Sequence, residues 1–147
     1  METKIPPPIV TVIFIFLIAF SNRLVEPFSF KYQMPLGIVI IICGLLVLIL
    51  AVRVFKQLET TINPMQPSQA SKLAIIGPFK YTRNPMYLGM SIMLIGFGLI
   101  FGAKLTVCLV VMFVLYITVF QIIPEERAMQ EKFTHWKDYC SKVRRWL

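Results

Sequence analysis

Residues 36–52 read LGIVIIICGLLVLILAV, a stretch without a charged side chain. A transmembrane helix needs about 17–25 mostly apolar residues, so this stretch is long enough to cross a bilayer. Three similar stretches occur in the chain. Together the four predict membrane spans at roughly 5–22, 36–53, 85–102 and 105–123. We therefore expect an all-α fold: an integral membrane helical bundle that the 147 residues form as a single domain.

The composition excludes the other common classes of protein. Hydrophobic residues make up 57% of the chain and charged residues only 15%. A soluble domain is usually about 45–50% apolar and about 25% charged. A soluble globule of this length exposes too much of its chain to hide so much apolar surface. Intrinsic disorder requires low hydrophobicity and is excluded as well.

The first apolar stretch is the shortest and has a second interpretation. Its core, residues 9–20, follows Lys4 and so has the outline of a signal peptide. The residues after it, Ser21, Asn22 and Arg23, lack the small-x-small pattern of a cleavage site. We therefore expect this stretch to be a retained helix.

The net charge of +8 predicts the orientation of the bundle. With four spans, twelve of the 15 Lys and Arg lie on the side that holds the N-terminus, the loop 53–84 and the C-terminal tail. The positive-inside rule makes that side cytoplasmic, so we expect both termini in the cytoplasm and the lipid bilayer as a partner. In a prokaryote this would be the inner membrane. Nucleic-acid binding is not expected, because the basic residues are spread along the chain and flank the spans.

The sequence lacks the residue patterns that disulfide frameworks, metal sites and proton-coupled transport require. The cysteines are odd in number and form no C-x-x-C pair, and His135 is the only histidine, so neither a disulfide framework nor a metal site is expected. No ionisable residue lies at the centre of a predicted span. A proton-coupled transporter normally needs such a residue, which argues against that class.

The first polar motif is Arg83-Asn84-Pro85, at the start of the third predicted span. Asn is a good N-cap and Pro suits the first helical position, so the motif predicts a helix N-terminus at the membrane surface. Such a terminus together with an arginine can hold an anionic group. Tyr87 lies one turn further on the same face, and Gly89 would allow a helix or ligand to approach closely. The alternative is an ordinary capped membrane helix with an interfacial arginine and tyrosine.

The second polar motif is Pro124-Glu125-Glu126, after the fourth predicted span. Pro124 starts a new helix or kinks the old one, and the helix dipole favours acidic residues in a first turn. Two adjacent carboxylates at the end of a span are costly unless a cation meets them. Arg83, Lys80 or a cationic ligand could do so. Beyond the motif, a single apolar face predicts a C-terminal amphipathic helix on the cytoplasmic side. That face consists of Met129, Phe133, Trp136, Cys140 and Val143.

Taken together, the two motifs resemble the isoprenylcysteine carboxyl methyltransferase and phospholipid methyltransferase superfamily of integral membrane enzymes. The resemblance covers roughly residues 63–147. It rests on Gly77-Pro78-Phe79, Arg83-Asn84-Pro85-Met86-Tyr87-Leu88-Gly89, Glu125-Glu126, Phe133-Thr134, Trp136, Tyr139 and Val143-Arg144-Arg145-Trp146. Asn-Pro at this position is similar to the form in small prokaryotic relatives.

The resemblance implies methyl transfer from S-adenosylmethionine to a lipophilic acceptor at the cytoplasmic membrane face. It places the cofactor region in residues 63–89 and 121–147. The cofactor-binding residues that it implies are Ser71, Lys72, Leu73, Ala74, Phe79, Asn84, Pro85, Met86, Tyr87 and Glu125. Arg83 and Glu126 are the candidate catalytic residues, with Glu126 as the candidate base if the acceptor is an amine or thiol. Gln121 is the candidate substrate-binding residue, because an acceptor-contacting arginine occupies its position in eukaryotic members.

The chemistry of the residues agrees with this implication. Arg83 and the helix start can take the carboxylate of the methyl donor, and Glu125 can take its ammonium or ribose. The acceptor could be an isoprenylcysteine carboxylate, a phospholipid amine or another small hydrophobic molecule. Two alternatives stay open. One is a membrane reductase of the sterol-reductase type with a nicotinamide cofactor, and the other is a non-enzymatic scaffold or exporter.

Overall fold

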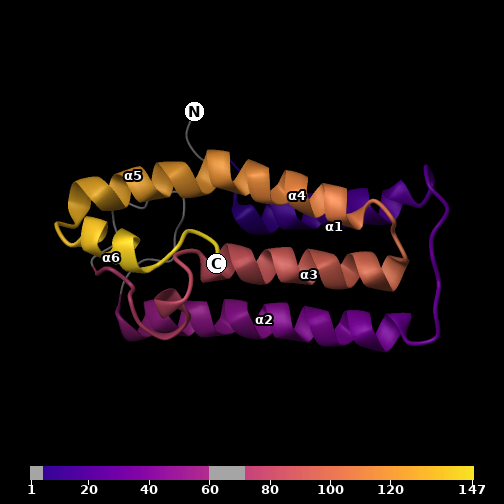
Figure 1. Cartoon of the computed structure of the whole chain (residues 1–147), viewed down its shortest axis with the longest axis horizontal. Coiled ribbons are helices and arrows are strands. Elements are labelled where there is room, and N and C mark those ends of the chain that lie inside the picture. The colour runs from indigo at the N-terminus through magenta and orange to yellow at the C-terminus, as the bar shows by residue number, and fades with distance from the viewer. Residues whose placement is uncertain (1–4, 60–71) are drawn as a thin grey trace.

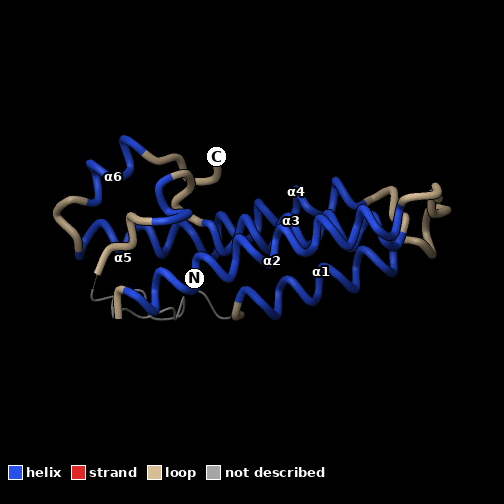
Figure 2. The backbone as a smooth tube through the Cα atoms, turned by 90° about the horizontal axis from the view of Figure 1, so that it is seen from below, coloured by secondary structure: helices blue, strands red, loops and turns tan. Residues whose placement is uncertain are grey.

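The computed structural model describes residues 5–59 and 72–147, and over these residues the chain is helical without a strand (Figures 1 and 2). The prediction of an all-α fold is confirmed. The elements are α1 (Pro7–Ser21), α2 (Gln33–Gln57), η2 (Gly77–Lys80), α3 (Pro85–Phe101), α4 (Thr106–Ile117), η3 (Thr118–Ile122), α5 (Ile123–Lys132) and α6 (Trp136–Lys142).

Four helices lie side by side in an up-and-down arrangement, with α3 in contact with α1, α2 and α4 (Figure 1). The start of α3, η2, α5 and α6 lie at one end of this bundle. The α1–α2 and α3–α4 connections lie at the other end. The two polar motifs therefore share one end of the bundle, as the sequence predicts.

In the part of the chain that the structure describes, two helical runs are long and apolar enough to cross a membrane, α2 and the continuous run Thr106–Lys132. The helices α1 and α3 are apolar but shorter, with 15 and 17 residues. At 1.5 Å per residue they rise only about 22–26 Å, against about 30 Å of hydrocarbon. Their outward surface is nevertheless apolar, since Phe16 of α1 is 70% exposed and Ile95 of α3 is 44% exposed. So much exposed apolar surface suits a lipid surrounding.

Glycines hold α2 and α3 in direct backbone contact. A Cβ atom on Gly44 would lie 2.6 Å from the carbonyl oxygen of Gly89, and one on Gly37 would lie 2.9 Å from that of Gly96. Gly37 and Gly44 are seven residues apart on α2, and Gly89 and Gly96 are seven residues apart on α3. The contact therefore repeats after two helical turns. Small residues at such an interface let two helix backbones approach closely. The close approach predicted at Gly89 is confirmed, and its partner is α2.

We expect Gly44→Ala to lower the stability of the fold by about 1–3 kcal/mol, because the added methyl group overpacks a backbone contact. Helix propensity alone predicts that the substitution raises the stability of the fold, since alanine is about 1 kcal/mol more favourable than glycine in a helix. The measurement is the thermal unfolding midpoint in detergent. Cys43→Ala is the matched control, because the exposed Cys43 precedes Gly44 on α2. An unchanged or raised midpoint for Gly44→Ala would contradict the close packing.

The run from α4 to α5 continues through Pro124 without a break. Proline lacks an N–H group, and its ring clashes with the carbonyl four residues earlier in an α-helix. A π-turn, η3, directly precedes this site, and Ile123 donates its N–H five residues back to Thr118. The wider turn accommodates the proline, so the second motif stays on the same continuous helical run as α4. This single turn also carries Gln121, which is 1% exposed.

The predicted single amphipathic helix after the second motif is two helices. The chain ends α5 at Lys132, and Phe133 is extended, with φ −111° and ψ 116°. The short α6 then turns back over the end of the bundle (Figures 1 and 2). The apolar residues still share one cluster, with Trp136, Tyr139 and Val143 buried and Met129, Phe133 and Cys140 packed beside them. Folding back buries a face that one straight helix would have left uncovered.

Candidate active site

The turn before α3 is anchored against α2. Gly77 has φ +60°, a left-handed conformation that suits glycine, and Pro78 follows it in η2. Phe79 of the same turn is 5% exposed and packs edge-to-face on Phe55 of α2, with 5.3 Å between ring centroids. Ala74 is buried in the same cluster. Gly77 and Pro78 thus form a turn that places the next polar residues over the end of the bundle.

The helix α3 begins at Pro85, with Asn84 as the N-cap residue, as the sequence predicts. The side chain of Asn84 makes no capping hydrogen bond. Its Nδ2 instead donates to the carbonyl oxygen of Arg145, at 2.9 Å. The hydroxyl of Thr82 accepts the Asn84 N–H, at 3.2 Å. The predicted capping role of the Asn84 side chain is therefore wrong, because a distant segment of the chain takes that side chain.

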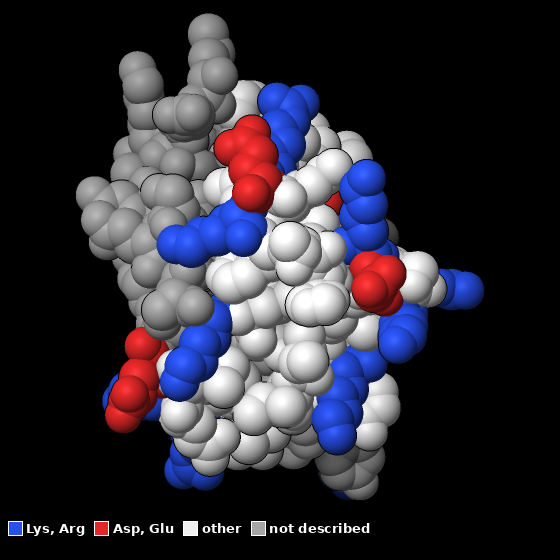
Figure 3. All heavy atoms as spheres, turned by 90° about the vertical axis from the view of Figure 1, so that its left-hand side faces the viewer, with Lys and Arg blue, Asp and Glu red and all other residues white. Residues whose placement is uncertain are grey.

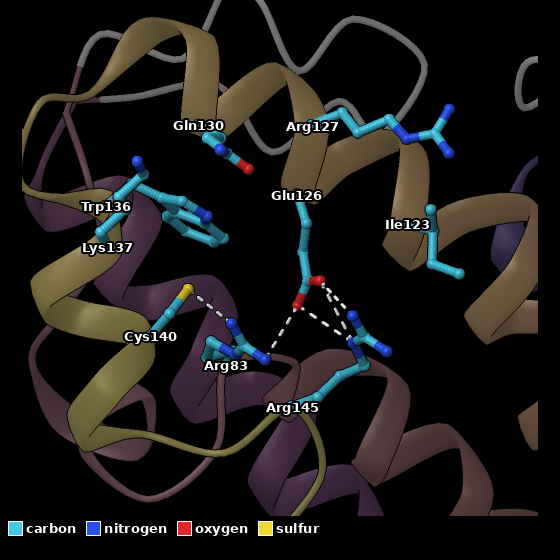
Figure 4. A pocket seen from close by; sticks show the side chains of 9 residues that line it. All are labelled: Arg83, Ile123, Glu126, Arg127, Gln130, Trp136, Lys137, Cys140 and Arg145. Atoms are coloured by element: carbon cyan, nitrogen blue, oxygen red, sulfur yellow. Dashed lines mark hydrogen bonds and ion pairs between the residues drawn. The ribbon is translucent and has the colours of Figure 1, made fainter.

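Arg83 and Glu126 join the two motifs (Figure 4). A guanidinium nitrogen of Arg83 lies 3.3 Å from a carboxylate oxygen of Glu126, and both side chains are largely buried, at 13% and 15% exposed. A second arginine, Arg145, reaches the other oxygen of Glu126 at 2.6 Å. Of the two side-chain partners that the sequence offers for the paired glutamates, Arg83 is the one in contact. The hydrogen bonds that Arg145 donates to Glu126 raise the pKa of Arg145 above its usual value.

Tyr87 and Glu125 form a second link, directly beside the first. The Tyr87 hydroxyl donates to Oε1 of Glu125 at 2.5 Å, and Tyr87 is 6% exposed. The adjacent glutamates of α5 therefore take different partners: Glu125 takes Tyr87, within α3, and Glu126 takes Arg83, two residues ahead of α3. The start of α3 and the start of α5 are fixed to one another by side chains of the two motifs.

The helix α6 completes the surroundings of Arg83. The guanidinium carbon of Arg83 lies 6.0 Å from the ring centroid of Trp136, and Nη1 donates to the Cys140 sulfur. Cation–aromatic contacts at this distance are attractive. The Tyr139 hydroxyl donates to the carbonyl oxygen of Phe79 at 2.7 Å, and burial raises the pKa of Tyr139. This bond ties α6 to the turn before α3.

A pocket of about 300 Å³ opens beside these residues (Figure 4). Its lining residues are Arg83, Ile123, Glu126, Arg127, Gln130, Trp136, Lys137, Cys140 and Arg145. Four of the nine are cationic and one is acidic, so the pocket favours an anionic group. Lys and Arg side chains also gather over this end of the molecule (Figure 3). Of the lining residues, only Arg83 and Glu126 are predicted from the sequence to be site residues.

The lining residues from α6 and the C-terminal segment could not be assigned from local pattern. Trp136 and Cys140 stand on the predicted apolar face, which suggests packing, and Arg145 belongs to a basic ending that suggests orientation. Only the turn at Phe133 brings them to Arg83. The resemblance to the membrane methyltransferases contains Trp136 and Arg145 and was the one signal that pointed to them.

Among the described residues, none of the predicted cofactor-binding residues lines the pocket. Ala74, Phe79 and Met86 pack toward α2, and Leu73 packs against the cluster of α6. Lys72 is exposed, and Ser71 lies outside the described residues. Pro85 is buried at the start of α3. That these residues hold a cofactor stays a prediction.

Gln121, the candidate substrate residue, faces a different neighbour. Its Nε2 donates to the carbonyl oxygen of Ile5, ahead of α1, at 2.8 Å. Its Oε1 is buried and accepts no hydrogen bond from the described residues. The side chain thus links the π-turn to α1 and retains one free acceptor. Its contact with an acceptor molecule stays a prediction.

Comparison with known proteins agrees with a helical membrane-type methyltransferase. A family model, phospholipid methyltransferase, matches residues 32–135. This range includes both motifs and the run between them. An uncharacterized protein of Haemophilus influenzae is 40% identical over 63 residues, which are 42% of this chain and all of that protein. No solved structure matches the chain significantly. The chain belongs to the phospholipid methyltransferase family, and that family implies methyltransferase activity and association with a membrane.

Proposed function

We propose that the protein transfers a methyl group from S-adenosylmethionine to a lipophilic acceptor at the cytoplasmic membrane face. One observation carries the proposal. The two motifs of the methyltransferase resemblance, some 40 residues apart in sequence, meet through the Arg83–Glu126 ion pair and the Tyr87–Glu125 hydrogen bond. Membership of the phospholipid methyltransferase family supports the reaction class.

The charges of the site fit the proposed methyl donor. S-adenosylmethionine carries a carboxylate, an ammonium and a sulfonium. Arg83 would hold the carboxylate, and its Nε–H is buried without a hydrogen-bond partner among the described residues. A buried unpaired donor is costly, and an anionic ligand would satisfy it. Glu125, at the start of α5, would hold the ammonium or the ribose.

The donor supplies a methyl group that is already electrophilic, because it is bonded to a sulfonium. The residues of this chain would therefore bind, orient and exclude water, and the reaction needs no protein nucleophile. Both oxygens of Glu126 accept hydrogen bonds from arginine, which suits an orienting group better than a base. We accordingly assign Glu126 to orienting Arg83.

The lipophilic acceptor would reach the site from the bilayer, between helices whose outward surfaces are apolar. The gathering of Lys and Arg at the end that carries the site supports a cytoplasmic position for that end (Figure 3). Both termini would then lie in the cytoplasm. The acceptor class covers an isoprenylcysteine carboxylate, a phospholipid amine or another small hydrophobic molecule.

The test is to incubate membranes that contain the protein with methyl-labelled S-adenosylmethionine and to identify the labelled product. We expect label in an organic-extractable small molecule or lipid. Membranes with Arg83→Ala protein at equal abundance are the control and should carry little label. Equal labelling by both membranes would contradict the proposal.

A further inference from the structure

The C-terminal segment from Val143 to Trp146 connects the two motifs. The carbonyl oxygen of Arg144 accepts the N–H of Arg83 at 3.0 Å. The carbonyl oxygen of Arg145 accepts from Asn84 at 2.9 Å and from the Thr82 hydroxyl at 3.3 Å. These bonds place the segment directly over the residues that open α3.

The same segment also reaches α5 and the π-turn. The guanidinium of Arg145 contacts Glu126 of α5 through Nε at 3.2 Å and Nη2 at 2.6 Å. The indole N–H of Trp146 donates to the hydroxyl of Thr118 at 3.2 Å. The segment thus bonds to both elements that carry the candidate site, from its backbone on one side and its side chains on the other.

The side chain of Arg145 orders the ion network of the pocket. Two nitrogens of its planar guanidinium meet the carboxylate of Glu126, which fixes the plane of that carboxylate. The fixed carboxylate in turn holds Arg83 at 3.3 Å. With Arg145 removed, Glu126 would keep a single arginine partner and could rotate. The direction in which Arg83 points would then be less well defined.

We propose that Arg145 is a positioning residue for methyl transfer, which acts through Glu126 to hold Arg83 in the orientation that binds the methyl donor. This inference rests on the proposed function. Arg145 need not contact the donor. Its role follows from the order of contacts, Arg145 to Glu126 and Glu126 to Arg83, which the dashed lines of Figure 4 mark.

Arg144, the residue before Arg145, offers a matched control. Arg144 carries the same charge, its backbone takes part in the same segment, and its side chain is exposed. Arg144→Gln and Arg145→Gln therefore remove equal charge from adjacent positions. A general effect of charge on donor binding or on the membrane surface would appear in both variants. An effect through Glu126 would appear in Arg145→Gln alone.

The experiment measures the dissociation constant of S-adenosylmethionine by calorimetry for purified full-length variants in detergent or lipid. We expect Arg145→Gln to weaken binding about tenfold and Arg144→Gln to leave it within about twofold, since groups in one ion network are strongly coupled. The double variant Glu126→Gln/Arg145→Gln should bind no more weakly than Glu126→Gln alone. Arg145→Lys should restore part of the affinity, because the ammonium keeps the charge but loses the planar fork.

The thermal unfolding midpoint, measured on the same samples, separates positioning from folding. A purely structural role of Arg145 would lower the midpoint and leave the affinity of the folded protein unchanged, which would overturn the inference. The inference would also be overturned if the double variant lost affinity by the product of the two single-variant losses. That result would show that Arg145 acts independently of Glu126. Absence of binding in the unmodified protein would overturn the proposed function and this inference together.

Discussion

Arg83→Ala is expected to weaken the binding of S-adenosylmethionine about a hundredfold. A charge-assisted hydrogen bond contributes about 1.5–3 kcal/mol, and Arg83 would bring such bonds to the carboxylate of the donor. The substitution also removes one of the two arginines on Glu126 and the cation over Trp136. The measurement is calorimetric titration of the purified variant with S-adenosylmethionine.

The control for Arg83 is Lys80→Ala, a cation at the end of the neighbouring turn η2 whose side chain is exposed. We expect this variant to bind the donor within about twofold of the unmodified protein, since exposed charges are screened by water and salt. Equal losses for the two variants would show that the site responds to net charge alone. Arg83 would then be a snorkelling arginine of an ordinary membrane helix.

Glu125→Ala should have the second largest effect and should lower donor affinity by tenfold or more. Glu125 accepts the hydroxyl of the buried Tyr87, and it is the proposed partner of the ammonium or ribose of the donor. Its loss also leaves the Tyr87 hydroxyl without an acceptor, which costs about 1–3 kcal/mol of stability. Calorimetry gives the affinity, and thermal unfolding gives the stability.

Glu131→Ala is the matched control for Glu125, because both residues lie on α5 and Glu131 is exposed. We expect its affinity and midpoint to stay near those of the unmodified protein. If the two alanine variants behaved alike, Glu125 would be only a favourable charge near a helix start. The close contact with Tyr87 would then have no bearing on ligand binding.

The helices and the meeting of the motifs could be predicted from the sequence because both depend on local signals. Long uncharged runs fix the helices, and Asn84-Pro85 fixes the start of α3. An arginine and two glutamates at the same end of antiparallel spans must find partners, and Glu126 finds Arg83. The glycine at 89 indicated close approach without indicating which helix approaches.

The parts that could not be predicted depend on contacts between distant residues. Asn84 is a good N-cap by local preference, yet the carbonyl oxygen of Arg145 takes its side chain. The helical spacing of the apolar residues continues through Phe133, so the local sequence does not predict that α5 ends there. The break is favourable only because α6 can then cover Arg83 and the turn at Phe79. The lining of the pocket by α6 depends on that break.

The central claim is that this chain binds S-adenosylmethionine through the joined motifs. Its most direct test is calorimetric titration of the purified, folded protein, in lipid or in a detergent that preserves its thermal unfolding transition. We predict saturable binding with one donor per chain, weakened strongly by Arg83→Ala and little by Lys80→Ala. No detectable binding by protein that still unfolds cooperatively would contradict the claim.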